Sequence, residues 1–350
     1  MNCCEKCFTD IELKAIVHGG DKIGKCDFCG ATRVHICDIE DETSGITDSL
    51  KNSFENLLDV YTPVSELGDS FPCNNQELIK SILVHRWKIF NITEDKVYTF
   101  LTKLLRERYA QQPDLFNTPV DISERYDEDY LKHYGILGTH NWEEFATEIK
   151  TRNRFHSEIM NKSIFSEILK YAILTYPKNN RGKLFYRARI CAEPKPLPKK
   201  EMKAPPIKLA SAGRVNPEGI SCLYLTEKIE TAILEVRASI YDYVSVGEFK
   251  LKNNIEVVDL TKMNSISPFC GLDTTLHAIN LSCLRQISEE IAKPMRRHDS
   301  KLDYLPTQYI CEYIKSLGYA GVKYRSTMDS NSFNLRFLYK GIIINHNKNR

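Results

Sequence analysis

The sequence predicts an α+β protein built from three consecutive parts, and three observations lead to that prediction. Residues 1–40 hold six of the twelve cysteines of the chain. Residues from about 45 to 177 place apolar side chains mainly at helical spacing. From about residue 182, short β-rich runs alternate with two clear helical patterns. We therefore expect a small cysteine-rich segment (1–42), an all-α domain (45–177) and a C-terminal α+β domain (182–347).

The overall composition is that of an ordinary globular protein, with 42% hydrophobic and 27% charged residues. A net charge of +2 gives no electrostatic case for bulk nucleic-acid binding. The chain has no run of 18 apolar residues, and its start lacks the basic and apolar regions of a signal peptide. We expect a cytoplasmic protein whose cysteines are reduced thiols or metal ligands.

Two cysteine pairs near the start have the spacing of a zinc ribbon. "CEKC" and "CDFCG" are C-x2-C pairs separated by 18 residues, so Cys4, Cys7, Cys26 and Cys29 can meet on one tetrahedral ion. Four thiolates leave no open coordination position, which predicts a structural and not a catalytic zinc site. Neighbouring side chains offer alternative ligands: Cys3, His35 and Cys37.

The middle of the chain is predicted to be helical from three stretches with apolar residues at helical spacing. They are "NQELIKSILVHRWKIF", "KVYTFLTKLLRERYA" and "NRFHSEIMNKSIFSEILKYAILT". Further along, "EPKPLPKKEMKAPP" is rich in Pro and Lys and has no apolar periodicity. This last stretch is predicted to be a surface loop or lid.

The stretch "GRVNPEGISCLYLTEKIETAILEVRAS", Gly213 to Ser239, predicts a turn, a strand and a helix. Thr226 is a candidate N-cap of that helix. Glu235 lies at the flank of the apolar face, so we expect the helix to project it into a cleft. The apolar face itself comprises Ile229, Ala232, Ile233, Val236 and Ile240.

A second helix and strand are predicted near the C-terminus. "LPTQYICEYIKSLG" has Pro306 in its first turn and Gly318 at its end, which is typical of a helix. "AGVKYRS" follows as a strand that ends at Ser326.

Together these motifs resemble the RES family, which is named after an Arg, a Glu and a Ser. The matching stretches are "FYRARI", "GRVNPEGISCLYLTEKIETAILEV" and "YLPTQYICEYIKSLGYAGVKYRSTMDSNSFNLRFLY". They follow one another in the family's order over about 160 residues. The preceding helical block is similar to the HEPN-like helical domain that is often fused to RES domains.

The resemblance implies an enzyme that consumes NAD+. RES domains resemble the ADP-ribosyltransferase fold, a split and curved pair of sheets that grips NAD+. Family members cleave the bond between nicotinamide and ribose, and several transfer ADP-ribose to inorganic phosphate. The resemblance therefore implies an NAD+ phosphorylase, or a glycohydrolase if water is the acceptor. Many family members are toxins paired with an antitoxin, which implies a role as a toxin or defence effector.

The chemistry of NAD+ cleavage assigns roles to individual residues. Glu235 would stabilise the positive charge that develops on the ribose. Arg187 and Arg214 would bind the two phosphates bidentately, and Arg214 and Tyr224 are also placed among the catalytic residues with Glu235. Tyr224 would hold the nicotinamide ring, and Ser326 would hydrogen-bond a phosphate or ribose. Arg189, two residues from Arg187, is the alternative family arginine.

Two other functions stay open from the sequence alone. The first is an ADP-ribosyltransferase that modifies a macromolecule, and the second is a regulatory module that binds protein or nucleic acid. The expected partners are NAD+ and inorganic phosphate, together with an antitoxin or trigger protein. A homodimer and contact with nucleic acid are left open, and no membrane contact is expected.

Overall fold

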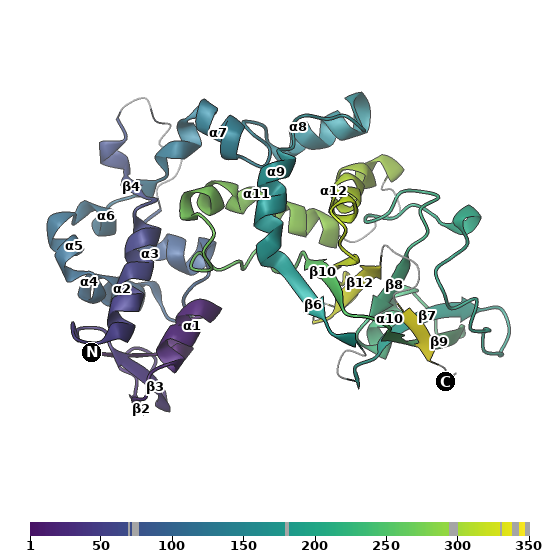
Figure 1. Cartoon of the computed structure of the whole chain (residues 1–350), viewed down its shortest axis with the longest axis horizontal. Helices are drawn as coiled ribbons and strands as arrows, with labels where there is room; N and C mark the ends of the chain where they lie inside the picture. The colour runs from purple at the N-terminus through teal and green to yellow at the C-terminus, as the bar shows by residue number, and fades with distance from the viewer. Residues whose placement is uncertain are drawn as a thin grey trace. The chain divides into compact units, whose positions relative to one another are not determined.

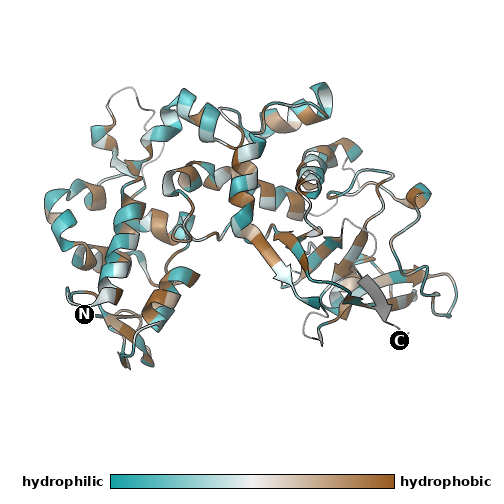
Figure 2. Cartoon of the chain, viewed as in Figure 1, coloured by the Kyte–Doolittle hydropathy of each residue, from teal (hydrophilic) through white to brown (hydrophobic). Residues whose placement is uncertain are grey.

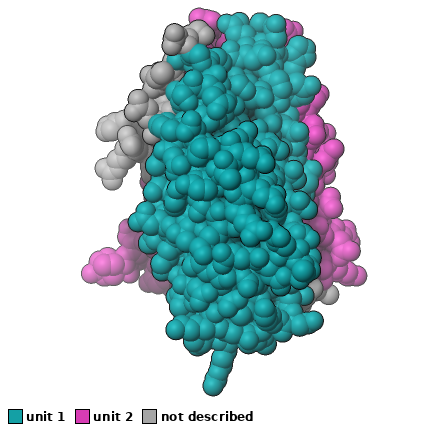
Figure 3. All heavy atoms as spheres, turned by 90° about the vertical axis from the view of Figure 1, so that its left-hand side faces the viewer, with its two compact units in different colours: residues 1–139, 265–281 teal, residues 140–264, 282–350 magenta. Residues whose placement is uncertain are grey.

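The computed structural model describes residues 1–68, 71, 77–178, 182–293, 300–329, 331–337 and 343–346, the last stretch as backbone alone. The fold mixes helix and sheet, with 43% of residues helical and 19% in strands. The chain forms two compact units, which Figure 3 colours separately. Unit 1 comprises residues 1–139 and 265–281, and unit 2 comprises residues 140–264 and 282–350. The three-part division expected from the sequence stays a prediction.

Unit 1 consists of short helices and two small sheets (Figure 1). Its strands are β1 (Asn2–Cys4), β2 (Ile23–Lys25), β3 (Thr32–Asp38), β4 (Thr62–Pro63) and β5 (Val120–Asp121). Its helices are α1 (Ile11–His18), α2 (Gly45–Leu58), α3 (Ile79–Ser81), α4 (Glu94–Leu104), α5 (Arg106–Gln111), α6 (Asp114–Asn117), α7 (Glu128–Tyr134) and the first part of α11 (Thr274–Ala292).

The cysteine-rich segment and the helices of unit 1 share one hydrophobic core. Phe8, which follows the first cysteine pair, packs against Phe90 with ring centroids 5.3 Å apart. Phe28, from the second pair, packs against Phe100 of α4 at 5.8 Å, and Phe100 in turn packs against Phe54 of α2 at 5.4 Å. Residues 1–40 therefore depend on the helices for part of their apolar burial.

A buried histidine makes the stability of unit 1 sensitive to acid. His277 of α11 is 0% exposed and lies edge-on against Trp87, with ring centroids 4.8 Å apart. Neither ring nitrogen has a hydrogen-bond partner within the described part of the chain. Burial lowers the pKa of His277 to about 4, because the charged ring would lose its hydration.

We expect the free energy of unfolding to fall as the pH drops from about 6.5 towards 4. In that window the unfolded histidine binds a proton and the folded one does not. The loss attributable to this group reaches roughly 3 kcal/mol, at about 1.4 kcal/mol per pH unit. Urea unfolding at pH 7.5 and pH 5, followed by tryptophan fluorescence, compares the natural protein with His277→Phe. An equal pH dependence in both proteins would contradict the prediction.

Unit 2 is built around an eight-stranded sheet of order β13-β9-β7-β8-β12-β11-β10-β6 (Figure 1). The strands are β6 (Ile173–Tyr176), β7 (Phe185–Cys191), β8 (Leu223–Thr226), β9 (Tyr243–Leu251), β10 (Ile255–Asp259), β11 (Gly321–Arg325), β12 (Phe333–Phe337) and β13 (Ile343–His346). Its helices are α8 (Trp142–Thr147), α9 (Lys162–Leu169), α10 (Ile229–Glu235), the second part of α11 and α12 (Leu305–Ser316).

The two faces of this sheet differ in character. The register pairs Tyr186 with Thr226 and Thr226 with Asn334, so these three side chains share one face. The opposite face carries the apolar core of unit 2, and Figure 2 shows brown, hydrophobic positions along these strands. That core includes Phe185, Leu225, Phe249, Leu335 and Phe337. By the same alternation Arg187 and Arg189 lie on the face of Phe185, whereas Asn334 lies on the other face.

The sheet opens between β7 and β8. Those two strands are paired at Tyr186 and Thr226 alone, whereas β7 and β9 pair from Phe185 and Phe249 to Cys191 and Tyr243. Helix α10 packs against β7, β8 and β9. The opening of the sheet therefore lies beside the helix that carries Glu235.

Helix α10 is shorter than the sequence predicted. Thr226 does not cap it, because this residue belongs to β8 and its hydroxyl donates to the carbonyl oxygen of Lys228 at 2.6 Å. The helix ends at Glu235 because Arg237 takes the left-handed conformation with φ 52°. Ile240, which was expected on the buried face, is consequently 95% exposed. Glu235 is the last residue of the helix.

Two further sequence predictions need correction. The stretch after α9 was expected to continue as a helix, but Ile173–Tyr176 form β6, which pairs with β10. β-branched and aromatic residues fit a sheet edge better than a helix. The long helix expected after residue 95 is broken at Leu105, which separates α4 from α5.

The predicted second helix and following strand are present as α12 and β11. Pro306 lies in the first turn of α12, and Gly318 beyond its end has φ 91°. None of the described helices combines the length and the hydropathy that a membrane span requires.

Candidate functional site

A cavity of ≈ 790 Å³ lies in unit 2 between α10, β7, β8 and the Gly213–Asn216 turn. Its size is within the range of small-molecule sites. Glu235, Tyr224 and Asn334 line the cavity, and so does a set of basic residues. That set comprises Arg187, Arg189, Arg214, Arg237 and Lys293. One carboxylate among several cations is suited to an anionic substrate with a positively charged reacting centre.

Glu235 is fixed through one of its two carboxylate oxygens. Its Oε1 accepts a hydrogen bond from Ser326 Oγ at 2.6 Å and another from Asn334 Nδ2 at 2.7 Å. Within the described residues, Oε2 has no hydrogen-bond partner in the protein. The carboxylate is therefore held in a fixed orientation while its second oxygen remains available to a ligand.

Ser326 is placed to orient Glu235. It follows β11, is 4% exposed and does not line the cavity, although its neighbours Thr327 and Met328 do. Its Oγ donates to Glu235 and accepts from the backbone N–H groups of Met328 and Asp329 at 3.2 and 3.3 Å. In this structure Ser326 contacts the carboxylate, where the sequence had suggested a phosphate or ribose contact.

The loop after Ser326 is tied to α10. Thr231, which is fully buried in α10, donates its hydroxyl proton in one of two contacts, to Asp329 Oδ2 at 2.9 Å or Ser332 Oγ at 2.8 Å. These contacts join the loop that holds Ser326 to the helix that holds Glu235. The separation between α10 and the loop that follows β11 is thereby restrained.

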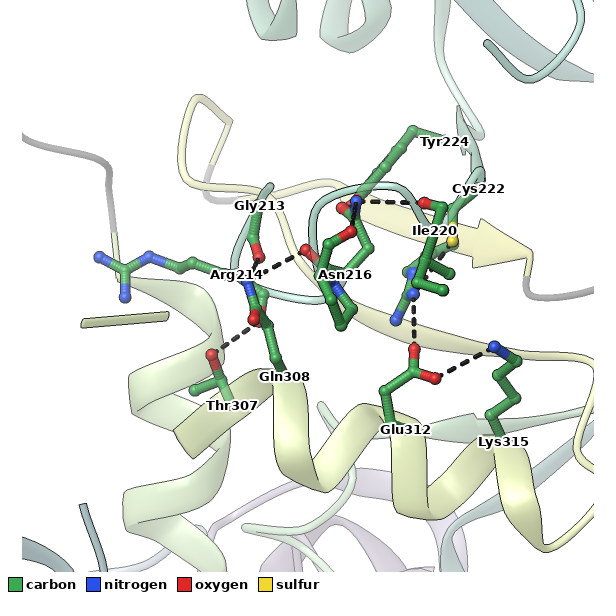
Figure 4. Close-up of polar contacts among 12 residues, drawn as sticks. Gly213, Arg214, Asn216, Ile220, Cys222, Tyr224, Thr307, Gln308, Glu312 and Lys315 are labelled. Atoms are coloured by element: carbon green, nitrogen blue, oxygen red, sulfur yellow. Dashed lines mark hydrogen bonds and ion pairs between the residues drawn. The ribbon is translucent and has the colours of Figure 1, made fainter. Parts of the chain in front are cut away.

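Tyr224 is joined to the Gly213–Asn216 turn, as Figure 4 shows. The Tyr224 hydroxyl donates to Asn216 Oδ1, and burial raises the pKa of Tyr224 above its usual value. A Cβ on Gly213 would lie 3.0 Å from Asn216 Oδ1 and 3.4 Å from the Tyr224 hydroxyl, which explains the glycine there. The ring of Tyr224 remains one wall of the cavity.

Asn216 holds the whole turn together. Its side chain is 4% exposed, and Nδ2 donates to the carbonyl oxygens of Ser211, Pro217 and Ile220 at 2.9, 3.1 and 3.4 Å. From α12, Gln308 Nε2 donates to the carbonyl oxygens of Gly213 and Asn216 at 2.7 and 3.0 Å. The sequence motif Gly-Arg-x-Asn-Pro and the Pro-Thr-Gln motif therefore meet in one hydrogen-bonded cluster (Figure 4).

Replacing Asn216 by Ala is expected to lower the free energy of unfolding by roughly 2–4 kcal/mol, because buried polar groups would lose their partners. Ser211→Ala is the matched control, since Asn216 contacts only the backbone carbonyl of Ser211. Urea unfolding followed by circular dichroism measures both variants. Equal stabilities of the two variants would show that the side chain of Asn216 is dispensable.

Arg214 borders the cavity, and its side chain extends away from Asn216 in Figure 4. Its guanidinium lies over the Tyr304 ring, 5.1 Å from the centroid, and Nη1 donates to the carbonyl oxygen of Glu290 at 3.4 Å. Glu290 is in the last turn of α11, where a cation is favoured by the helix dipole. Arg214 is thus held at the edge of the cavity.

Arg187 and Arg189 are engaged by the Lys- and Pro-rich segment. Arg187 Nη1 donates to the carbonyl oxygens of Met202, at 3.0 Å, and Lys203, and Arg189 Nη1 donates to that of Glu201 at 2.7 Å. Burial, and to a smaller extent the charge of Arg189, lowers the pKa of Arg187 to about 10. Arg187 therefore keeps its charge at neutral pH.

The structure brings Glu235 and Ser326 into direct contact and places Tyr224 and the arginines around the same cavity. Sequence reasoning missed two residues of β12. An Asn at position 334 is predicted from its residue type to brace a turn, whereas it lies in β12 and donates to Glu235. Sequence reasoning did not consider Arg336, which is fully buried and donates to Glu312 Oε1 and Cys222 Sγ at 3.3 and 3.0 Å. The sequence did contain a signal, because Asn334 and Arg336 are two positions apart and therefore lie on the same face of a strand.

A separate group of four thiols lies in unit 1. The Sγ atoms of Cys4, Cys7, Cys26 and Cys29 all lie within 4.8 Å of one another. Cys4 and Cys29 are 3.4 Å apart, as are Cys7 and Cys26, and sulfur ligands at about 2.3 Å from a shared ion would have similar separations. The donor set fits a metal ion. The alternative ligands Cys3, His35 and Cys37 are not members of the group.

A comparison with protein-family models assigns the region around the cavity. Residues 185–341 match the RES domain. The RES match begins at β7 and includes Arg187, Glu235 and Ser326, the residue types after which the family is named. It does not include the helical middle or the cysteine group.

A comparison with solved structures found similarity to the crystal structure of the M. tuberculosis MbcT-MbcA toxin-antitoxin complex. The identity is 12%, the TM-score is 0.31, and the alignment covers 53% of this chain and 90% of that chain. The search of the curated proteins found no match.

Proposed function

We propose that this protein degrades NAD+ by cleaving the bond between nicotinamide and ribose and transferring ADP-ribose to inorganic phosphate. The observation that carries the proposal is Glu235, a carboxylate anchored through one oxygen at the wall of a cavity lined by arginines. The RES match over the same residues supports it. Hydrolysis and transfer to a macromolecule are the competing reactions.

The proposed reaction breaks one bond and forms one. The C1′–N bond of the nicotinamide riboside breaks, and nicotinamide leaves as a neutral molecule with the bonding electron pair. Positive charge develops on C1′ and the ring oxygen of the ribose. A phosphate oxygen then forms a bond to C1′ with its own electron pair, which gives ADP-ribose bonded to phosphate.

Each residue of the site has a role in this proposal. Glu235 stabilises the charge on the ribose through its carboxylate. Tyr224 supplies an aromatic face for the nicotinamide ring. Arg214 and Arg187 bind phosphate groups, because the guanidinium fork matches their oxygens. Ser326 keeps the carboxylate oriented.

The supply of cations favours phosphate over water as acceptor. A phosphorylase must hold a third phosphate beside the diphosphate of NAD+, and Arg189, Arg237 and Lys293, the last of these paired with Glu290, also line the cavity. The opening of the sheet between β7 and β8 also supports the resemblance to the split sheets of the ADP-ribosyltransferase fold.

Incubation with NAD+ in the presence and absence of phosphate tests this proposal. We expect consumption to rise with phosphate and saturate, and mass spectrometry to identify ADP-ribose phosphate and free nicotinamide. Equal rates without phosphate, with plain ADP-ribose as product, would replace phosphorolysis by hydrolysis. Intact NAD+ under both conditions would refute the proposed function.

We also propose that the cysteine group binds one zinc ion and that the protein acts as a toxin or defence effector with an inhibitory partner. The first rests on the mutual distances of the thiols, and the second on the RES match alone. Induced expression should lower the cellular NAD+ content and stop growth, whereas expression of Glu235→Gln should not. Growth arrest that persists with Glu235→Gln would separate toxicity from NAD+ cleavage.

A further inference from the structure

Asn334 has an arrangement that its contact with Glu235 does not fully explain. Its side chain is 5% exposed and lines the cavity. A carboxylate only accepts hydrogen bonds, so the amide must turn Nδ2 towards Glu235 Oε1, 2.7 Å away. Oδ1 consequently points elsewhere, and it has no hydrogen-bond partner within the described part of the chain. Leaving a buried acceptor unpaired destabilises the folded protein.

The sheet holds Asn334 in this orientation. Asn334 lies on β12 between Thr226 of β8 and Tyr324 of β11, which are its partners in the register. A residue between two paired strands cannot move far without breaking the ladder on both sides. Ser326 already donates to the same oxygen of Glu235. Holding the carboxylate therefore does not by itself require a second donor, least of all a buried amide whose own oxygen is left unpaired.

We propose that Asn334 is a substrate-binding residue that also positions Glu235, with Oδ1 accepting a hydrogen bond from a hydroxyl of the nicotinamide ribose. This inference rests on the proposed function. An acceptor needs a donor, and the phosphates of NAD+ provide none. Because Asn334 is in direct contact with Glu235, the donor it meets belongs to the sugar on which Glu235 acts. One amide thus connects the carboxylate to the ribose.

A cycle that combines one protein substitution with one change in the substrate tests the contact with the ribose. Asn334→Ala and the natural protein are each assayed with NAD+ and with analogues that lack the 2′- or the 3′-hydroxyl of the nicotinamide ribose. For one of these analogues we expect a loss of at least about tenfold in kcat/KM with the natural protein. With Asn334→Ala the same analogue should cost less than about twofold, because the partner is gone. Losses that multiply independently for both analogues would overturn the inference.

Ser326→Ala is the matched control. It removes the other donor to Glu235 Oε1 and leaves Asn334 in place. This variant should be slower with NAD+ and should still show the full loss with the deoxy analogue. If Ser326→Ala also loses its sensitivity to the missing hydroxyl, the ribose contact belongs to Glu235 and not to Asn334.

Asn334→Asp tests the positioning of Glu235 separately. Asp has nearly the same size as Asn but places a second carboxyl group beside Glu235, so the two acidic groups should share a proton. The acid limb of the pH profile of kcat/KM should move upwards by about one pH unit or more. An unshifted profile would contradict the proposed contact, since a purely structural defect lowers activity equally at all pH values.

The outcomes separate the inference from the function on which it rests. If the natural protein leaves NAD+ intact, both fall. If the natural protein consumes NAD+ and Asn334→Ala has the same kcat, KM and sensitivity to the deoxy analogues, only the role of Asn334 falls. Circular dichroism of each variant establishes that the compared proteins are folded.

Discussion

Replacing Glu235 by Gln is expected to lower NAD+ turnover at least about a hundredfold while the protein stays folded. The carbonyl oxygen of Gln can accept the hydrogen bonds from Ser326 and Asn334 that Oε1 of Glu235 now accepts. What disappears is the negative charge that stabilises the developing cation on the ribose. Removal of one such electrostatic contact costs about 3–4 kcal/mol, or two to three powers of ten in rate.

The measurement is the rate of nicotinamide release at saturating NAD+, with the melting temperature determined on the same samples. Glu230→Gln is the control, because Glu230 is exposed on the same short helix and does not line the cavity. We expect the control to turn over NAD+ like the natural protein. Turnover by folded Glu235→Gln within a factor of ten of the natural rate would remove Glu235 from the reaction.

Loss of the proposed zinc ion is expected to destabilise far more than the first 40 residues. A structural zinc site contributes about 10–16 kcal/mol to the folding of a small domain. The aromatic residues that follow the cysteines pack into the same core as α2 and α4. Removing the ion should therefore unfold the packing of these helices as well as the cysteine-rich segment.

Cys26→Ser and Cys37→Ser make a matched pair for this prediction. Both cysteines are buried in the same segment, but only Cys26 belongs to the four-thiol group. Elemental analysis should give about one zinc ion per chain for the natural protein and for Cys37→Ser. Hydrogen exchange should show loss of protection in α2 and α4 for Cys26→Ser alone. Freshly purified protein without zinc, or equal protection in both variants, would contradict the prediction.

Most of the site was predictable because the residues concerned lie in turns and at element ends, where sequence has local meaning. Gly213, Asn216 and Pro217 have the composition of a tight turn, and Pro306 and Gly318 bracket a helix as such residues do. Glu235 was expected at the flank of the apolar face of a longer helix, and it lines the cavity as the last residue of α10. The cysteine spacing likewise predicted which thiols would meet, and the alternatives Cys3 and Cys37 lie outside the group.

What could not be predicted depends on tertiary contacts. The end of α10 is set by the left-handed conformation of Arg237. A non-glycine residue in that conformation is uncommon and cannot be predicted from the local pattern of apolar residues. The burial of Arg336 requires α12 to supply Glu312, a residue 24 positions away in sequence. Asn334 becomes part of the site only through the pairing of β8, β12 and β11.

The hydrogen bonds between Arg187, Arg189 and the Lys- and Pro-rich segment (residues 193–206) determine which sequence changes that segment can tolerate. Within the described part of the chain, the hydrogen bonds of these guanidinium groups end on main-chain carbonyl oxygens, those of Glu201, Met202 and Lys203. Any amino acid supplies such an oxygen. Exposed side chains of the segment can therefore be exchanged without loss of these contacts, whereas an insertion or deletion would shift the carbonyl oxygens away from the arginines. Chain length, more than amino-acid identity, is the property that this segment must keep.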